Sequence, residues 1–403
     1  MKQKGLGGFF EEFLEKEPLF TDKKVLQSNF TPGNIPHRDE EIEQIAQILA
    51  PCLKLEKPSN LFIYGKTGTG KTVSMSFISN QISDIAKKKD IPLDIIYLNC
   101  KLKKVADTEY RLIAQLLRSF NIPIPSTGLP TQELYQTLYT ILDKKEKSVI
   151  LVLDEIDQLV EKTGDEILYN LTRINAELKN TQVTIVGISN SISFKDYLDP
   201  RIRSSLSEEE IIFPPYNALQ IQDILKERSA KAFKQESLQD GVIEKCAAYA
   251  AREHGDARRA LELIRVAGEI AERKNQQQIM IGDIDNAEEK IEKERILDII
   301  KTQPRQHQAA LNSILMICSQ KKGSIFTGEV YELYREICAK ISLRPLTQRR
   351  VSDIIGELDM LGIINAKVIS KGRYGRTREI SLALSSVIEQ KIKNILSDEL
   401  SLS

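Results

Sequence analysis

Short apolar runs alternate with longer amphipathic stretches through the first half of the chain. The runs Ile95–Leu98, Val149–Leu153 and Val183–Ile188 are mostly apolar, as are strands that are buried on both faces of a parallel sheet. The stretches Glu109–Phe120 and Thr131–Leu142 carry apolar residues at helical spacing. Strands that alternate with helices predict a three-layer α/β domain with a parallel sheet.

The pattern changes twice farther along the chain. Pro214 and Pro215 end the alternation, and the residues from there to about Lys301 have helical character throughout. Beyond Pro304, three more helical stretches precede a strand–turn–strand pattern over residues 363–384. The sequence therefore predicts an α/β domain, an all-α domain and a helical domain that ends in a β-hairpin. The predicted bounds are 1–212, 213–300 and 301–403.

Residues 65–72 read Gly-Lys-Thr-Gly-Thr-Gly-Lys-Thr and match the phosphate-loop motif G-x-x-x-x-G-K-[ST] in full. The apolar run Leu61–Tyr64 precedes the motif and an amphipathic stretch follows it, so the glycines connect a strand to a helix. Backbone N–H groups of such a loop cradle phosphates, while Lys71 reaches the outer phosphates and Thr72 offers a hydroxyl to Mg²⁺. The motif predicts a site for a nucleoside triphosphate. The candidate binding residues are Gly65, Lys66, Thr67, Gly68, Thr69, Gly70, Lys71, Thr72 and Val73.

Two carboxylates, Asp154 and Glu155, follow the apolar run that ends at Leu153. A carboxylate at the tip of a central strand holds Mg²⁺ in phosphate-loop enzymes, and Asp154 fits this position. Glu155 can orient and deprotonate the water that attacks the terminal phosphate. Behind a phosphate loop, this pair predicts hydrolysis of the nucleotide.

Three further polar residues have two interpretations each. Asn190 ends the next apolar run and can hold the attacking water, although Ser-Asn is also common in ordinary turns. Arg201 can act as an arginine finger on the nucleotide of a neighbouring subunit. Arg258 can reach the terminal phosphate from the helical domain. Both arginines can equally be solvated surface residues, and the spacing alone leaves these alternatives open.

Composition adds little to this picture. The 57 basic and 57 acidic residues cancel, so net charge neither favours nor excludes a polyanionic partner. The five cysteines lie far apart without metal-ligand spacing, which is typical of core residues in a reducing compartment. No apolar run approaches the roughly 20 residues that a membrane span requires. We expect a cytoplasmic protein that has no membrane partner.

The spacing of these motifs resembles that of the AAA+ ATPases, and several strings narrow the resemblance. The segment from Pro32 to Glu40 is similar to the P-x-x-[IL]-P-H-R-[DE] motif of archaeal replication initiators of the origin-recognition/Cdc type. The other matching strings, in the order of that family, are Tyr64–Thr72, Gly187–Asn190, Phe213–Tyr216, Gly255–Arg258 and Gly372–Thr377. The ordered set spans nearly the whole chain.

The resemblance implies an α/β P-loop AAA+ domain, an all-α lid domain and a C-terminal winged helix-turn-helix domain, with ATP or ADP and Mg²⁺ as cofactors. The residues that it places on phosphates, Mg²⁺ or the attacking water are Lys71, Thr72, Asp154, Glu155, Asn190 as first sensor and Arg258 as second sensor. The residues that it places elsewhere on the nucleotide are Ile35, Arg38, Tyr216 and Arg228. Ser191 stands where the family usually has Asp, which leaves the hydrogen bonding around Asn190 open.

The C-terminal domain carries the candidate DNA contacts. Thr347 can cap a helix that has Arg349 and Arg350 on its polar face and an apolar opposite face. A glycine-hinged basic hairpin follows this helix. Its candidate contacts are Lys371, Arg373, Tyr374 and Arg376. A recognition helix and a basic wing predict a winged helix-turn-helix that binds double-stranded DNA, although winged helices also serve as protein docking modules.

We therefore expect a slowly hydrolysing ATP/ADP switch that binds origin DNA and helps to recruit or load the replicative helicase. Further expected partners are other copies or paralogues of the initiator, and the expected location is cytoplasmic, at the nucleoid. Alternatives are a non-replicative AAA+ DNA-binding ATPase of the transposition or plasmid-maintenance type, a regulator of initiation, and a clamp-loader subunit. The basic wing and the Pro32–Glu40 segment favour the initiator.

Overall fold

The chain forms two compact units, residues 1–284 and residues 285–403. The computed structural model describes residues 17–27, 30–101, 108–125, 128–206, 208–321, 323, 325–370, 376–382 and 386–400.

The first unit is built on a five-stranded sheet with the strand order β2-β3-β4-β1-β5 and parallel pairing throughout. The strands are β1 (Leu61–Tyr64), β2 (Leu93–Asn99), β3 (Lys147–Asp154), β4 (Thr181–Ser189) and β5 (Glu209–Ile212). The central strands β3 and β4 are buried along almost their whole length, which explains their apolar sequences. The edge strand β5 was not predicted, because only Ile211 of its four side chains is buried.

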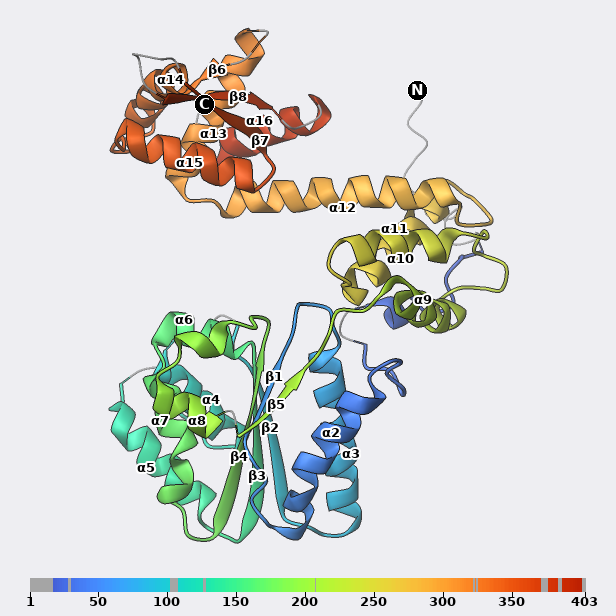
Figure 1. Cartoon of the computed structure of the whole chain (residues 1–403), viewed down its shortest axis with the longest axis vertical. Coiled ribbons are helices and arrows are strands. Elements are labelled where there is room, and N and C mark those ends of the chain that lie inside the picture. Colours follow the sequence, from blue (N-terminus) through green and yellow to red (C-terminus); the bar gives the residue numbers. More distant parts are fainter. Residues whose placement is uncertain are drawn as a thin grey trace. The chain divides into compact units, whose positions relative to one another are not determined.

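Helices cover both faces of this sheet (Figure 1). On one face lie α2 (Asp39–Leu49) and α3 (Lys71–Lys88). On the other face lie α4 (Glu109–Ser119), α5 (Thr131–Leu142), α6 (Ile156–Thr163), α7 (Glu166–Thr172) and α8 (Pro200–Leu206). Side chains of β3 alternate between the two cores: Ile150 and Val152 pack with α2 and α3, whereas Leu151 and Leu153 pack on the opposite face. The predicted three-layer α/β domain is confirmed.

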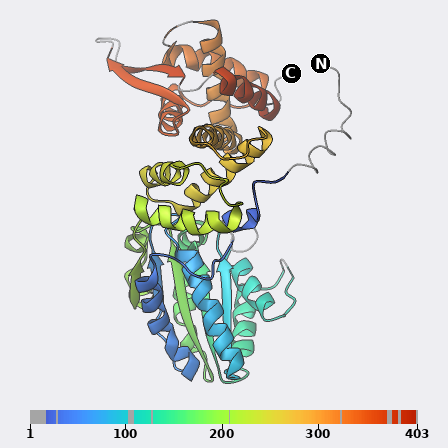
Figure 2. The ribbon, with the colours of Figure 1, turned by 90° about the vertical axis from the view of Figure 1, so that its right-hand side faces the viewer.

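A small helical lid completes the first unit. It contains α9 (Ala218–Ala232), α10 (Val242–Arg252) and α11 (Ala257–Arg273). Figures 1 and 2 show these helices beyond the end of the sheet at which the strands finish. The N-terminal residues 17–27 run along the lid, where the Phe20 ring packs 4.6 Å from the Phe233 ring and against Gly268 of α11. A Cβ atom at position 268 would lie 2.5 Å from the Phe20 ring, so this contact requires glycine.

The second unit contains helices packed against a small antiparallel sheet of order β6-β8-β7. Its helices are α12 (Ile281–Thr302, which begins in the first unit), α13 (Arg305–Gln320), α14 (Thr327–Lys340), α15 (Gln348–Met360) and α16 (Ser386–Leu400). Its strands are β6 (Ile325–Phe326), β7 (Ile364–Ser370) and β8 (Arg376–Leu382). The three helices α13, α14 and α15, followed by the hairpin of β7 and β8, confirm the predicted winged helix-turn-helix fold.

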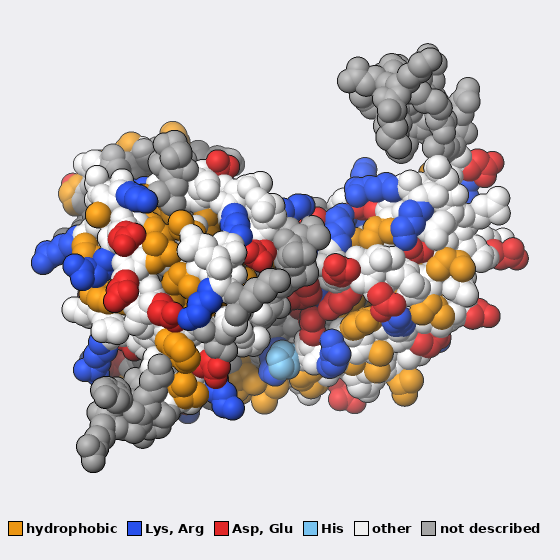
Figure 3. All heavy atoms as spheres, turned by 90° about the horizontal axis from the view of Figure 1, so that it is seen from above, with side chains coloured by type: hydrophobic (Ala, Val, Ile, Leu, Met, Phe, Trp, Pro, Cys, Tyr) orange, Lys and Arg blue, Asp and Glu red, His pale blue; other side chains and the backbone are white. Residues whose placement is uncertain are grey.

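The surface is mixed in charge. On the face drawn in Figure 3, basic and acidic side chains of the described residues are interspersed. Among the described residues, no helix combines the length and the apolar character needed to cross a membrane.

Candidate functional site

The phosphate-loop motif forms the turn between β1 and α3, at the end of the sheet where the strands finish. Gly68 and Gly70 have φ of +74° and +98°, a left-handed region that favours glycine. The Lys71 ammonium lies 2.8 Å from the carbonyl oxygens of Gly65 and Lys66. It also lies 2.9 Å from Oδ1 of Asn190. The loop is thus folded around a lysine whose ammonium points into its hollow.

The environment of Lys71 favours the loss of its proton. Burial lowers the pKa of Lys71 from 10.5 to about 8, and the nearby Asp154 carboxylate opposes this effect only in part. The Arg258 guanidinium contributes to this lowering of the pKa. A bound polyphosphate would reverse the balance, because its negative charge favours the ammonium form.

Asp154 is held at the tip of β3 by two hydroxyl groups. Its Oδ2 atom accepts hydrogen bonds from Thr72 Oγ1 at 3.0 Å and from Tyr97 OH at 2.6 Å. Burial and the Asp154 charge raise the pKa of Tyr97, so the phenol keeps its proton and donates it to the carboxylate. Mg²⁺ prefers such oxygen ligands, and it is commonly held by one or two carboxylates together with substrate phosphates. Thr72 and Asp154 therefore fit the cation that accompanies a nucleotide.

Glu155 has an unusual backbone and an incompletely bonded carboxylate. Its φ is +55°, in the left-handed region that non-glycine residues rarely adopt, at the residue that precedes helix α6. Its Oε1 atom lies 3.5 Å from the Asn190 amide nitrogen and 3.8 Å from the Lys101 ammonium. Its Oε2 atom is buried and has no hydrogen-bond partner among the described residues. Such an orphaned acceptor suits a carboxylate that receives a proton from water.

Asn190 connects the phosphate loop to Glu155, because its side chain contacts both Lys71 and the glutamate. Its backbone N–H donates to Asp157 on α6 at 3.4 Å. Ser191, the departure from the family pattern, donates its N–H to Ser189 Oγ at 3.0 Å. Sequence reasoning missed Tyr97 and Asp157, although Asp157 stands two residues after Glu155 and could have been found from that spacing.

Two neighbouring pockets of the first unit share Gly68, Gly70, Thr72 and Arg258 in their linings, and we describe them together as the polar end and the wider end of one site. Its polar end is lined by Gly68, Gly70, Lys71, Thr72, Asp154, Glu155, Asn190 and Arg258. Its wider end is lined largely by apolar residues, among them Phe30, Ile35, Val73, Tyr216, Ile224 and Leu261. Gly65, Lys66, Thr67 and Thr69 shape the loop without lining the pocket. A charged end beside an apolar end matches the phosphates and base of a nucleotide.

Arg228 lies at the wider end of this pocket, on the lid helix α9. Its guanidinium donates to the Val25 carbonyl oxygen at 3.2 Å and stacks over the Phe30 ring at 4.6 Å. Burial lowers its pKa. Arg228 thus ties the N-terminal segment to the lid, and Phe30, which the sequence analysis missed, joins it in the pocket wall.

Arg38 occupies a different position from the one the resemblance implies. It does not line the pocket, and only 2% of its surface is exposed. Its guanidinium donates to the carbonyl oxygens of Thr69 and Pro214 and to the Glu41 carboxylate. The structure therefore places Arg38 behind the pocket wall, with all three guanidinium nitrogens bonded to protein.

Arg201 lies on α8 and is not brought to this pocket. Its guanidinium forms a two-point ion pair with Asp199, at 3.1 and 3.2 Å, and lies 5.7 Å from the centre of the Tyr169 ring. Its side chain is 71% exposed. The side chain is oriented by these contacts yet remains accessible from outside the subunit.

The predicted recognition helix is α15, and Thr347 caps it by accepting a hydrogen bond from the Arg350 N–H. Arg349 and Arg350 are both exposed at its start. Arg350 pairs with Glu357 at 3.1 Å, and His307 pairs with the same carboxylate at 2.6 Å. These contacts hold the pKa of Glu357 below its usual range.

The tip of the predicted wing is not covered by the structure. Lys371, Arg373 and Tyr374 lie outside the described residues, and Arg376 begins β8 without a described side chain. The next arginine, Arg378, packs its guanidinium against Gly356 of α15, where a Cβ atom would approach it to 3.0 Å. Sequence reasoning did not single out Arg378, whose helix contact depends on the hairpin folding back.

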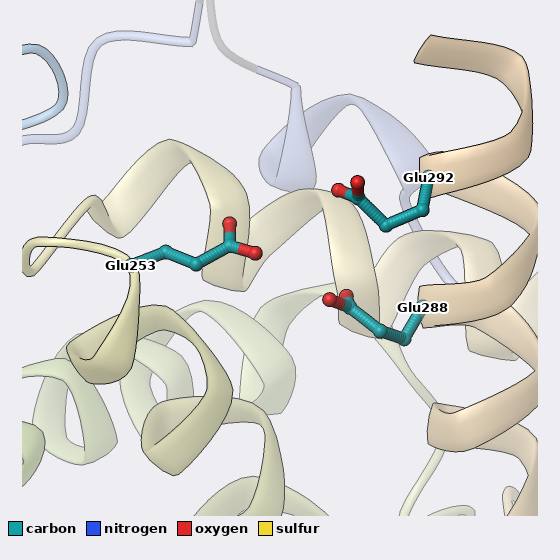
Figure 4. Close-up of side chains that lie close together, drawn as sticks. All are labelled: Glu253, Glu288 and Glu292. Atoms are coloured by element: carbon teal, nitrogen blue, oxygen red, sulfur yellow. The ribbon is translucent and has the colours of Figure 1, made fainter. Parts of the chain in front are cut away.

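Three acidic side chains are drawn in Figure 4. Glu288 and Glu292 lie one turn apart on α12, and Glu253 follows α10 in the other compact unit. Glu253 pairs with Arg259 at 3.2 Å and Glu292 with Arg295 at 3.5 Å. Glu253 and Glu292 already have cationic partners, and we assign no cation to the three carboxylates.

Three family models match successive parts of the chain. Residues 55–193 match an AAA domain, residues 222–289 match a Cdc6 AAA+ ATPase-type lid domain, and residues 298–390 match the C-terminal winged helix domain of CDC6. The order agrees with the fold.

Similar proteins cover nearly the full chain. An ORC1-type DNA replication protein of Pyrococcus horikoshii is 52% identical over 98% of this chain and 94% of its own length. An ORC1-type DNA replication protein 1 of Methanosarcina mazei is 46% identical over 99% and 95%. The solved structure of the Aeropyrum pernix ORC1 protein in complex with DNA superposes with a TM-score of 0.82 at 41% identity. That match covers 95% of this chain and 98% of the other.

Proposed function

We propose, because the chain belongs to the family of archaeal ORC1-type DNA replication proteins, that it binds origin DNA under the control of ATP and helps to recruit or load the replicative helicase. The observation that carries this proposal is the pocket in which the phosphate loop, the acidic pair of β3 and the lid arginine meet. A nucleotide there would contact both the sheet domain and the lid, so its state can bias the lid.

ATP or ADP with Mg²⁺ fits this pocket. Lys71 and the loop amides would hold the phosphates, and Thr72 and Asp154 would hold Mg²⁺, which neutralises phosphate charge when bound. Glu155 would orient a water and take its proton, and Asn190 would keep Glu155 at the right distance from Lys71. Arg258 would add a positive charge from the lid. We propose weak hydrolysis, whose role is to change state.

Double-stranded origin DNA is the proposed partner of the second unit. The relative from Aeropyrum pernix was solved in complex with DNA, which supports this partner for a chain of the same fold. Arg349 and Arg350 at the start of α15 would enter the major groove, and the wing with Arg373 and Arg376 would follow the phosphates. A salt-dependent affinity would result, since each phosphate contact releases counterions.

Further assignments follow from the same proposal. We assign the AAA+ domain to residues 1–212, the lid to 213–300 and the DNA-binding domain to 301–403. Arg201 would act on the nucleotide of a neighbouring initiator copy or paralogue, because it is exposed and lies outside its own pocket. A DNA-binding initiator would work in the cytoplasm, at the nucleoid.

The test is a footprint of the purified protein along its own genome, with ATP and with ADP. We expect protection of a few replication origins, altered in extent by the nucleotide, and a Lys71→Ala control that no longer distinguishes the two nucleotides. Protection confined to mobile elements or plasmid sites would instead identify a transposition or plasmid-maintenance ATPase.

A further inference from the structure

Arg38 is the most completely buried arginine of the first unit, and it joins three segments that are far apart in the sequence. Its Nε atom donates to the Thr69 carbonyl oxygen of the phosphate loop at 2.8 Å. One terminal nitrogen donates to the Pro214 carbonyl oxygen in the linker that leads to the lid. The other pairs with Glu41, at the start of α2, at 2.9 Å. A single guanidinium therefore bridges the phosphate loop and the linker.

Two aromatic rings complete the surroundings of this side chain. The guanidinium carbon lies 4.0 Å from the centre of the Tyr216 ring and 5.4 Å from that of Phe213. Both rings belong to the linker on either side of Pro214 and Pro215. Stacking adds to the hydrogen bonds, so the linker contacts the Arg38 guanidinium through its backbone and through its side chains.

The neighbouring peptide of the phosphate loop bonds directly to the lid. The Ala257 N–H, at the start of α11, donates to the Gly68 carbonyl oxygen at 3.2 Å. The Asp256 carboxylate packs so closely on Gly68 that a Cβ atom there would lie 1.7 Å from its Oδ1 atom. Two consecutive loop carbonyl groups are thus held by groups outside the loop, one by the lid and one by Arg38.

We propose that Arg38 is a positioning residue that couples the phosphate loop to the lid through the linker. Because this coupling presupposes nucleotide in the pocket, it rests on the proposed function. Arg38 itself does not touch the nucleotide. When phosphates bind in the loop and shift the Thr69 peptide, the Arg38 guanidinium moves with it and shifts Pro214. The lid that follows Pro214 then brings Arg258 to the phosphates.

A double-mutant cycle tests this coupling, with the affinity for a fluorescent ATP analogue as the readout. Arg38→Lys keeps the charge beside Glu41, but one ammonium cannot reproduce the planar fork that reaches Thr69 and Pro214 together. In the wild type, Arg258→Ala should weaken ATP binding. In the Arg38→Lys background the same substitution should weaken it much less, with a coupling of about fivefold or more in Kd.

The matched control is Asp223→Asn. Asp223 pairs with His37 at 3.0 Å and also links the N-terminal segment to the lid, but at the exposed surface. In the double variant, the factors by which Asp223→Asn and Arg258→Ala each change Kd should multiply to within about twofold, as expected for independent sites. If the changes in Kd caused by Arg38→Lys and Arg258→Ala also multiply to within this limit, Arg38 has only a structural role and the proposal is overturned.

Hydrogen exchange on the wild type provides a measurement that needs no variant, should Arg38→Lys fail to fold. A peptide that covers residues 209–213 lies outside the pocket lining but ends beside Pro214. Its exchange should slow when ATP binds, and unchanged exchange would overturn the coupling. If the wild type does not bind ATP at all, the proposed function fails first, so the two failures are distinguishable.

Discussion

The affinity for ATP should fall steeply above pH 8, because Lys71 must be protonated to meet the phosphates. In the free protein the pKa of Lys71 lies at about 8, and bound phosphates should return it at least to its ordinary 10.5. A group whose pKa rises on binding favours the complex fully below the lower pKa and loses this contribution as pH rises between the two values. The difference of roughly 2.5 pKa units corresponds to about 3 kcal/mol of binding free energy.

Titration calorimetry at several pH values measures this effect. Between pH 7 and pH 9 the affinity should fall about tenfold, because Lys71 is mostly charged in the free protein at pH 7 and mostly uncharged at pH 9. Buffers of different ionisation enthalpy should report uptake of about 0.9 proton per ATP at pH 9 and about 0.1 at pH 7. Lys71→Arg should flatten the dependence, because a guanidinium keeps its proton in this range. Equal affinity at both values without proton uptake would refute the reasoning.

The remaining predictions concern the other proposed roles. Glu155→Gln should keep ATP binding and lose hydrolysis, as a phosphate-release assay would show, since the carboxylate acts only on the attacking water. Arg201→Ala should leave the ATP affinity of dilute monomer unchanged and lower only hydrolysis that rises with protein concentration; weaker binding by the monomer would contradict a role in a neighbouring subunit. Removing Arg373 and Arg376 together should weaken binding to every duplex and reduce the salt slope by about one unit per lost contact. Arg350→Ala should instead narrow the difference in binding free energy between origin and random DNA, by roughly 1–3 kcal/mol in a competition titration.

The layered fold could be predicted because the central strands have an uninterrupted signal. The apolar sequences of β3 and β4 reflect burial on both faces. Their ends also predict the position of the site, since neighbouring parallel strands present their last residues at one edge of the sheet. This is why Asp154 and Asn190, 36 positions apart in the sequence, both lie beside Lys71. The edge strand β5 escaped prediction because three of its four side chains are exposed.

The position of Arg38 could not be predicted from its motif. Two of its three hydrogen-bond partners are backbone carbonyl groups, which every residue offers and no sequence pattern marks. Tyr97 was missed for a related reason: it reads as one more large residue of β2, and only the pairing of β2 with β3 brings its hydroxyl to Asp154. Short-range spacing predicts what one loop does, whereas contacts between strands or domains depend on the completed fold.

The two arginines that begin α15 are not equivalent, although they are adjacent. Arg350 is held by Glu357, which His307 holds in turn, whereas no such chain of contacts among the described residues restrains Arg349. A side chain that is already ordered loses less rotamer freedom on binding, a difference of about 0.5–1.5 kcal/mol for a long side chain. To bind DNA as proposed, Arg350 would have to exchange the Glu357 carboxylate for a DNA partner. If α15 is the recognition helix, as proposed, it would offer DNA one arginine that is fixed in advance and one that can adapt. Exchanging their positions should then not be neutral, even though composition and charge stay the same.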